Sequence, residues 1–155
     1  MTRFFDIDSA NAAVPELDGI LSVLADQRAE LVRLRDDVLE RTGGGEAGSG
    51  TRGERRSGGG ADTEDDRDAG AATADDLRLT RLRMQGLIDQ MAAGVARIDA
   101  MGITLRDIES GLVDFPALVS GRQVWLCWRL GEDSVDWWHD LDAGFSGRRP
   151  LAELV

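Results

Sequence analysis

The only cysteine and the only histidine of the chain, Cys127 and His139, lie close together in its C-terminal third. A thiol and an imidazole can act as nucleophile and base, but only when both side chains point to the same side of the fold. The strand pairing derived below places them on opposite faces of a sheet. The sequence therefore predicts no catalytic residue, and it favours structural roles for both side chains.

Acidic residues around His139 raise the question of a metal site. Asp136, Asp140 and Asp142 are interleaved with apolar residues, and carboxylates with one imidazole can hold a single ion. Strand alternation turns His139 away from Asp136 and Asp140, whereas Asp142 can lie beyond the strand. A single cysteine permits no cysteine-built zinc site. We expect no metal ion and no other cofactor, with a carboxylate–histidine site as the open alternative.

The segment 144–149, Gly-Phe-Ser-Gly-Arg-Arg, is a third candidate for chemistry. Glycines let a backbone approach a ligand, and an arginine can bind a carboxylate or phosphate through two parallel hydrogen bonds. The spacing matches neither a phosphate-binding loop nor a dinucleotide motif. Two interpretations remain open. Either the segment binds an anion, or it folds back on the sheet with Phe145 as a plug and Arg148 paired to an acid.

Residues 112–141 predict three short strands, separated by turn signals at 120–121 and 131–133. A two-residue loop at 120–121 places Phe115 opposite Leu126, and a second loop centred on 132–133 places Leu126 opposite His139. This register gathers the apolar side chains on one face, and a slip of one residue would scatter them. Pro116 predicts that the first strand lies at the edge of the sheet.

The same register predicts which side chains share the opposite face. Asp114, Cys127 and Trp138 lie side by side there, together with Trp125, while Trp128 and Trp137 fall on the packed face. We expect the C-terminal segment or a second subunit to cover the two outer tryptophans, because exposed aromatic patches mark interaction sites. The candidate residues for binding a ligand or partner are Asp114, Trp125, Cys127, Arg129, Trp138, His139 and Arg148.

Two long helices, 15–42 and 74–101, are predicted to cover the packed face, with a short helical turn at 105–111. Asp6 can cap the preceding helical stretch, and Pro15 is expected to kink or restart the helix. Apolar side chains recur every seven residues, as in paired helices. They are Leu17, Leu24, Leu31 and Val38, then Leu77, Met84, Met91 and Ile98, joined by Ile20, Leu34, Leu87, Ile88 and Val95. The predicted fold is α+β: a long antiparallel helical hairpin packed on a small three-stranded antiparallel β-meander.

The segment 43–73 separates the two helices and has a different composition. It is rich in glycine and aspartate and contains no aromatic or large aliphatic residue. Such a segment cannot bury enough apolar surface to offset the entropy lost on ordering. We therefore predict a single domain, 1–155, with a flexible insertion at 43–73.

The charge balance narrows the classes of partner. The chain of 155 residues carries a net charge of −11, with a sequence pI of about 4.5. Nucleic acids and anionic membranes would repel such a protein, so neither is expected as a partner. All basic residues are arginines, and tyrosine is absent. No apolar run approaches the length of a membrane span, so a cytoplasmic location is expected.

Three blocks in the C-terminal third carry a family resemblance. They are residues 111–119 (Gly-Leu-Val-Asp-Phe-Pro-Ala-Leu-Val), residues 121–132 (Gly-Arg-Gln-Val-Trp-Leu-Cys-Trp-Arg-Leu-Gly-Glu), and Trp138-His139 through Gly144-Phe145 to Gly147-Arg148. These blocks, and the N-terminal segment 5–11, resemble the prokaryotic family called domain of unknown function 2203. The resemblance covers the chain except for the insertion, and it implies no reaction.

Two functions from different classes follow as hypotheses. The long apolar seams and the lack of a reactive constellation favour a non-enzymatic, self-associating interaction module. The alternative is a protein or enzyme that binds a small anionic ligand on the sheet and the 144–149 loop. That site would use Asp114, Arg129, Trp138 and Arg148. The identity of a ligand or partner does not follow from the sequence.

Overall fold

The computed structural model describes residues 2–43 and 64–154 of the chain. The chain divides into two compact units. The sheet unit comprises Met1–Ala29 and Asp89–Val155, and the helical unit comprises Glu30–Ile88. All strands of the described residues belong to the sheet unit, whereas the helical unit contains parts of the two long helices.

Helix α1 (Ile7–Gly43) begins with the predicted cap. The backbone amide of Ser9 donates to Asp6 Oδ1 at 2.7 Å, and the Asp6 amide donates to Ser9 Oγ at 3.0 Å. These hydrogen bonds satisfy two backbone amides that the first turn of the helix leaves unpaired. Hydrogen bonding from Ser9 to the Asp6 carboxylate also lowers the pKa of Asp6. One continuous helix passes through Pro15, which excludes the restart considered above.

Helix α2 (Glu64–Ala100) begins ten residues before the predicted start at residue 74, so that prediction is wrong. The additional residues, 64–73, include several alanines and acidic residues. Alanine favours helix, and acids near an N-terminus interact well with the helix dipole, so the sequence of these turns can continue the helix. The rest of the predicted insertion, residues 44–63, lies outside the described residues.

The two helices pair antiparallel, as predicted. In the sheet unit Gln27 Nε2 donates to Gln90 Oε1 at 3.2 Å, and in the helical unit Glu30 pairs with Arg83. Leu17 and Ile98 are buried seam residues. The seam assignment of Ile88 is wrong, because this side chain is exposed.

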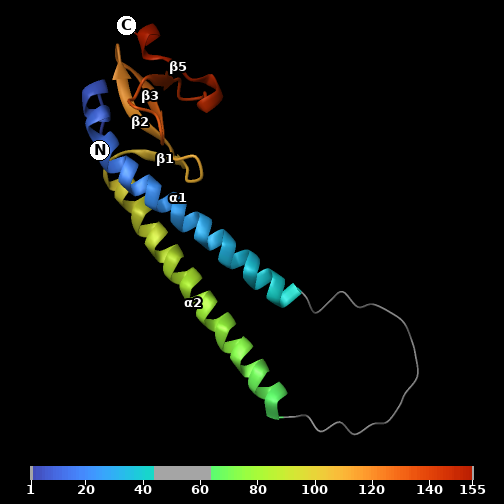
Figure 1. The fold of residues 1–155 in the computed structure, drawn as a ribbon. Coiled ribbons are helices and arrows are strands. Elements are labelled where there is room, and N and C mark those ends of the chain that lie inside the picture. The colour runs from blue at the N-terminus through green and yellow to red at the C-terminus, as the bar shows by residue number, and fades with distance from the viewer. Residues whose placement is uncertain (1, 44–63, 155) are drawn as a thin grey trace, which may run out of the picture. The chain divides into compact units, whose positions relative to one another are not determined.

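The sheet of the described residues has five antiparallel strands in chain order, not three. Figure 1 shows the long hairpin of β2 and β3 within it. They are β1 (Thr104–Asp107), β2 (Leu112–Val119), β3 (Arg122–Arg129), β4 (Trp137–His139) and β5 (Arg149–Pro150). Strand β1 replaces the predicted helical turn, and it flanks the first half of β2, so β2 is not the edge strand. Pro116 lies beyond the residues paired with β1, and its carbonyl accepts a hydrogen bond from the Phe5 amide at 2.7 Å.

The register of the first hairpin is confirmed, and that of the second is wrong by one residue. Phe115 pairs with Leu126 across a turn in which Ser120 and Gly121 both have positive φ, as a two-residue hairpin loop requires. Leu126, however, pairs with Trp138 and not with His139. A shift of one residue exchanges the two faces of a strand.

The loop 130–136 explains this shift, because it is longer than the predicted turn. Gly131 has a φ of +100°, and the Glu132 carboxylate accepts a hydrogen bond from the Arg129 amide at 2.7 Å. Val135 folds into the core, and its amide donates to Asn11 Oδ1 at 2.7 Å. The chain therefore enters β4 with the opposite alternation from the prediction.

Trp138 consequently lies in the core and not on the outer face. The core is formed by the inner face of the sheet, the first half of α1 and the end of α2. It includes Leu17, Leu21, Leu24, Ile98, Phe115, Leu126, Trp128 and Trp138. The indole Nε1 of Trp138 is buried without a hydrogen-bond partner among the described residues.

In the part of the chain that the structure describes, no helix has the length and hydrophobicity needed to cross a membrane.

Candidate functional site

The outer face of the sheet brings Asp114, Cys127 and His139 together. Cys127 on β3 lies opposite Asp114 on β2 and opposite Trp137 on β4, and His139 is two residues further along β4. All three side chains are buried, and their polar atoms lie within 4.8 Å of one another. The prediction that Cys127 and His139 occupy opposite faces is therefore wrong, because it used the shifted register.

Hydrogen bonds fix the orientation of the imidazole. His139 Nδ1 lies 2.8 Å from the carbonyl oxygen of Asp140, and Nε2 lies 3.0 Å from Asp114 Oδ1. Arg106 Nε on β1 donates to the other carboxylate oxygen, Oδ2, at 2.8 Å. A carbonyl can only accept, so Nδ1 carries a proton. One further proton must lie between Nε2 and Oδ1, because two acceptors would repel each other there.

These hydrogen bonds predict which ring nitrogen of His139 carries a proton. In the nitrogen spectrum of the untagged, isotope-labelled protein, Nδ1 is expected to be protonated at neutral pH. Because His139 is the only histidine, one imidazole gives the whole signal. Substitution of Asp114 by asparagine should change the Nε2 signal and leave Nδ1 protonated. A neutral ring with its proton on Nε2 alone would contradict the observed hydrogen bonds.

The environment of Cys127 opposes ionisation. Burial, reinforced by the nearby charge of Asp114, raises the pKa of the Cys127 thiol from 9.0 to about 11, although Arg148 acts in the opposite direction. Arg148 Nη1 lies 3.9 Å from the sulfur. A thiol is a strong nucleophile only as the thiolate. In this structure Cys127 is therefore not a poised nucleophile at neutral pH, although His139 lies nearby.

The raised pKa makes the stability of the protein sensitive to alkaline pH. A thiol that ionises at lower pH when unfolded contributes stability below pH 9, and this contribution is lost as the pH rises toward 11. We expect the free energy of unfolding to fall over this range by on the order of 2 kcal/mol. With no lysine or tyrosine, Cys127 is the only side chain with an ordinary pKa in this range.

Urea denaturation at a series of pH values measures this loss. Substitution of Cys127 by serine serves as the control and should remove the pH dependence. The same decrease in the serine variant would show that another group causes it.

Arg148 is held in place by Glu132. Two hydrogen bonds of 3.0 and 2.7 Å join the guanidinium to the carboxylate, and the guanidinium stacks on Trp137 and on Phe145. Burial would raise the pKa of Glu132, but the hydrogen bonds from Arg148 and the Arg129 amide lower it overall. Arg148 is thus paired to an acid, as one interpretation of the loop predicted. Phe145 is not a buried plug, because 39% of it is exposed.

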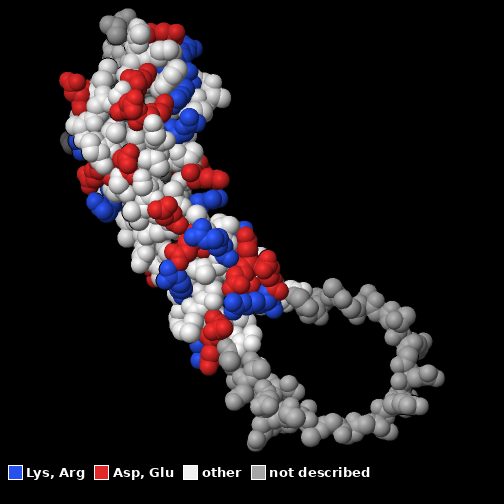
Figure 2. Space-filling view, in the orientation of Figure 1, with Lys and Arg blue, Asp and Glu red and all other residues white. Residues whose placement is uncertain are grey.

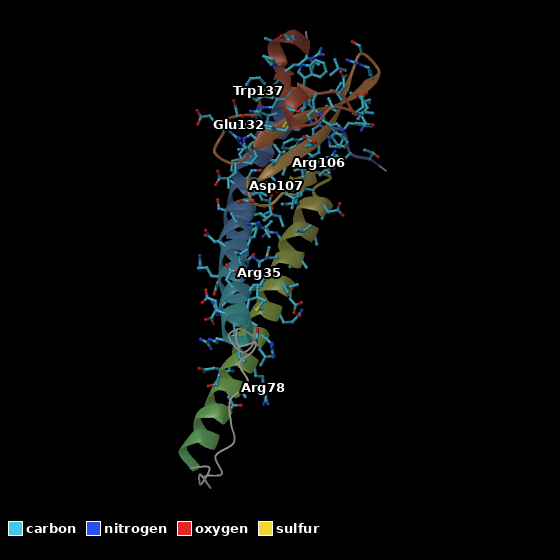
Figure 3. All side chains as sticks on the ribbon, turned by 90° about the vertical axis from the view of Figure 1, so that its right-hand side faces the viewer. Arg35, Arg78, Arg106, Asp107, Glu132 and Trp137 are labelled. Atoms are coloured by element: carbon cyan, nitrogen blue, oxygen red, sulfur yellow. The ribbon has the colours of Figure 1, made fainter. Side chains whose placement is uncertain are left out.

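A cavity of about 300 Å³ opens beside the carboxylate–imidazole pair. Arg106 from β1, labelled in Figure 3, lies at its margin with Asp114 and His139. The remaining lining residues are Leu112, Leu141, Asp142, Ala143, Gly144 and Phe145. The buried side chains of Asp114 and His139 therefore meet open space at one place on the sheet.

The other candidate residues are less closely associated. Trp125 is half-buried on the outer face beneath Arg106, whose guanidinium lies 5.0 Å from the ring centre. Arg129 is exposed and stacks on Phe145 at 5.3 Å. Trp138 does not take part, because it faces the core. The predicted patch of Trp125 and Trp138 on one face therefore does not exist.

Sequence reasoning missed Arg106 and Glu132. Polar and apolar residues alternate at Thr104, Leu105 and Arg106, which is a pattern typical of a strand. This pattern could have indicated a strand that places Arg106 near Asp114. The contact of Glu132 with Arg148 had no comparable signal, because it depends on the path of the loop.

Charges on the face shown in Figure 2 are mixed, with arginines interspersed among acidic residues.

These features define a small α+β protein with a buried carboxylate, imidazole and thiol beside a cavity on its sheet. The chain belongs to the family described as "Uncharacterized conserved protein (DUF2203)", whose model matches residues 3–151. This confirms the resemblance drawn from the sequence. No curated protein and no solved structure matches the chain.

Proposed function

We propose that this protein binds a small molecule with an anionic group in the cavity beside Asp114 and His139. The observation that supports this proposal is the buried, hydrogen-bonded pair of Asp114 and His139 at the wall of an open cavity. Burying such groups costs free energy that apolar side chains would not require. Clefts that combine apolar walls with a few convergent polar groups are typical ligand sites.

Arg106 is the residue suited to bind the anionic group. Its Nε is used by Asp114, but the described residues provide no hydrogen-bond partner for its two terminal nitrogens. These nitrogens can donate to a carboxylate or phosphate at the margin of the cavity. Leu112 and Phe145 provide apolar contacts for the rest of the ligand. Arg148 is not assigned this role, because Glu132 already occupies its guanidinium.

Nuclear magnetic resonance of the single histidine tests the proposal. Inorganic phosphate and succinate are added to the full-length, untagged protein, and the His139 signals are followed. We expect saturable shifts and loss of binding when Arg106 is replaced by glutamine. Arg97→Gln is the matched control, because Arg97 is exposed, pairs with Glu16 and does not line the cavity. The proposal would be contradicted if neither phosphate nor succinate gave saturable shifts. It would also be contradicted if Arg106→Gln bound the anion as tightly as the wild-type protein.

Self-association is a second candidate function, favoured by exposed apolar side chains in the helical unit. Leu79 and Leu82 are 64% and 62% exposed and lie three residues apart, which places them on one face of α2. Sedimentation at micromolar concentration should reveal a dimer or larger assembly that Leu79→Gln with Leu82→Gln dissociates. Leu141→Gln, an exposed position in the sheet unit, is the control. A monomeric wild-type protein would contradict this function.

A further inference from the structure

We propose that Asp114, Cys127 and His139 bind one zinc ion, with a further coordination position open to the cavity. The inference deepens the proposed function and rests on it, since the ion would provide a direct contact for an anionic ligand beside Arg106. It depends on the geometry of the three side chains, which come from the three adjacent strands β2, β3 and β4.

The three ligand types together favour zinc. Thiolate, imidazole and carboxylate groups are the protein ligands of Zn²⁺, whereas Mg²⁺ and Ca²⁺ prefer oxygen atoms alone. Zinc sites with three protein ligands keep a fourth position for water or substrate. Here Asp114 and His139 line the cavity, so that position would face open space.

The distances fit such an ion with little rearrangement. Zinc bonds of 2.0–2.3 Å place neighbouring ligand atoms of a tetrahedron about 3.3–3.6 Å apart. Asp114 Oδ1 and His139 Nε2 are 3.0 Å apart, and one ligand atom from each of Asp114, Cys127 and His139 lies within 4.8 Å of the other two. The two closer atoms would separate slightly, and the sulfur would move toward the ion.

The surrounding hydrogen bonds are those that orient metal ligands. A metal-binding histidine usually donates its second ring N–H to a carbonyl or carboxylate, and His139 Nδ1 donates to the Asp140 carbonyl. Arg106 holds Asp114 Oδ2, which leaves Oδ1 available as a single ligand atom. Arg148 is positioned to donate to the Cys127 sulfur, a contact that stabilises a bound thiolate.

The charges are compatible with a divalent cation. Asp114 neutralises Arg106, and Glu132 neutralises Arg148. On binding, the thiol proton and the proton between Nε2 and Oδ1 leave to solvent, and Zn²⁺ takes their place. The thiolate then provides one further negative charge to the ion.

Calorimetric titration with Zn²⁺ tests the inference on the full-length protein. Any histidine tag is removed and the protein is first freed of metal, because a tag would bind zinc itself. We expect one zinc ion per chain at micromolar protein concentration. The nitrogen spectrum should show metal on His139 Nε2 with Nδ1 still protonated. No stoichiometric uptake, or metal on Nδ1, would overturn the inference.

Cobalt substitution identifies the sulfur ligand. Co²⁺ bound by a thiolate gives a sulfur-to-cobalt charge-transfer band, and Cys127→Ser should abolish it. Because Cys127 is the only cysteine, no other residue can produce the band. A cobalt complex of the wild-type protein without this band would overturn the inference. Serine is nearly isosteric with cysteine, so this variant should remain folded, which circular dichroism checks.

Ligand variants give the quantitative comparison. Cys127→Ser and Asp114→Asn should each weaken zinc binding by more than the roughly 10–100-fold that loss of an outer hydrogen-bond partner costs. Asp136→Asn is the matched control, because this exposed aspartate lies outside the cluster and should leave affinity unchanged. Equal affinity of Cys127→Ser and wild type would overturn the inference.

The two proposals fail in distinguishable ways. Phosphate or succinate binding by a protein that takes up no zinc would support the cavity as a ligand site and reject the metal. One zinc ion on Asp114, Cys127 and His139, without binding of either anion, would support the metal and reject the anionic ligand. Anion binding that requires zinc would support both.

Discussion

Replacement of Asp114 by alanine is expected to lower the free energy of unfolding by about 3–5 kcal/mol. The Asp114 carboxylate accepts from Arg106 and faces His139, and 4% of its side chain is exposed. Without it, the buried imidazole loses its partner at Nε2, which is the main cost. Arg106 contributes less, because its side chain is 43% exposed and can be hydrated.

Asp140→Ala provides a matched comparison from the same part of the sheet. The Asp140 carboxylate pairs with Arg122 at 2.9 Å, and both side chains are partly exposed. Exposed pairs contribute about 0–1 kcal/mol, and the Asp140 carbonyl can still accept from His139 in this variant. Urea denaturation measures both changes. A similar small loss in both variants would show that the Asp114–His139 pair does not support the fold.

The Gly111→Ala substitution is expected to be costly for two physical reasons. Gly111 has a φ of +68°, a conformation that costs an ordinary L-residue about 1–2 kcal/mol. A Cβ atom at this position would also lie 2.5 Å from Leu130 Cβ. Relieving that overlap requires a backbone shift, which adds about 1–3 kcal/mol. The expected total is about 2–5 kcal/mol.

Gly121→Ala separates the two contributions. Gly121 has a similar φ of +75°, but no atom lies within 4 Å of a Cβ placed there. This variant should lose only the conformational part, about 1–2 kcal/mol. The difference between the variants, measured by thermal or urea unfolding, gives the cost of the contact with Leu130. If the two losses were equal, the close approach of Gly111 to Leu130 would have no energetic effect.

Sequence patterns were sufficient to predict the first hairpin and the fold class, because both depend on short-range features of the chain. The Ser120-Gly121 turn leaves one possible loop length, so the pairing of Phe115 with Leu126 followed from it. The α+β class followed from the change of apolar period after the second helix. These features depend on neighbouring residues and on the pattern of burial alone.

The second hairpin could not be predicted in the same way. Its loop is shaped by the Glu132 carboxylate and by the contact of Val135 with Asn11, more than a hundred residues away in the sequence. This changed the register by one residue and reversed the faces of Trp137, Trp138 and His139. Trp137 therefore lies opposite Cys127 on the outer face, and its predicted place on the packed face is wrong. The pairing of Asp114 with Cys127 on the outer face was predicted from the sequence and is confirmed, but the convergence of His139 with them was not predicted. Tertiary contacts decided which of them meet.

The short outer strands limit how this protein can join another chain. Exposed strand edges with free backbone groups promote pairing between chains. Here β5 has two residues and includes Pro150, which lacks an amide hydrogen, while β1 has four residues and an irregular register. Beyond β1, Phe5 already occupies the Pro116 carbonyl. Addition of a partner's strand to this sheet is therefore disfavoured, and any partner chain would have to contact side chains.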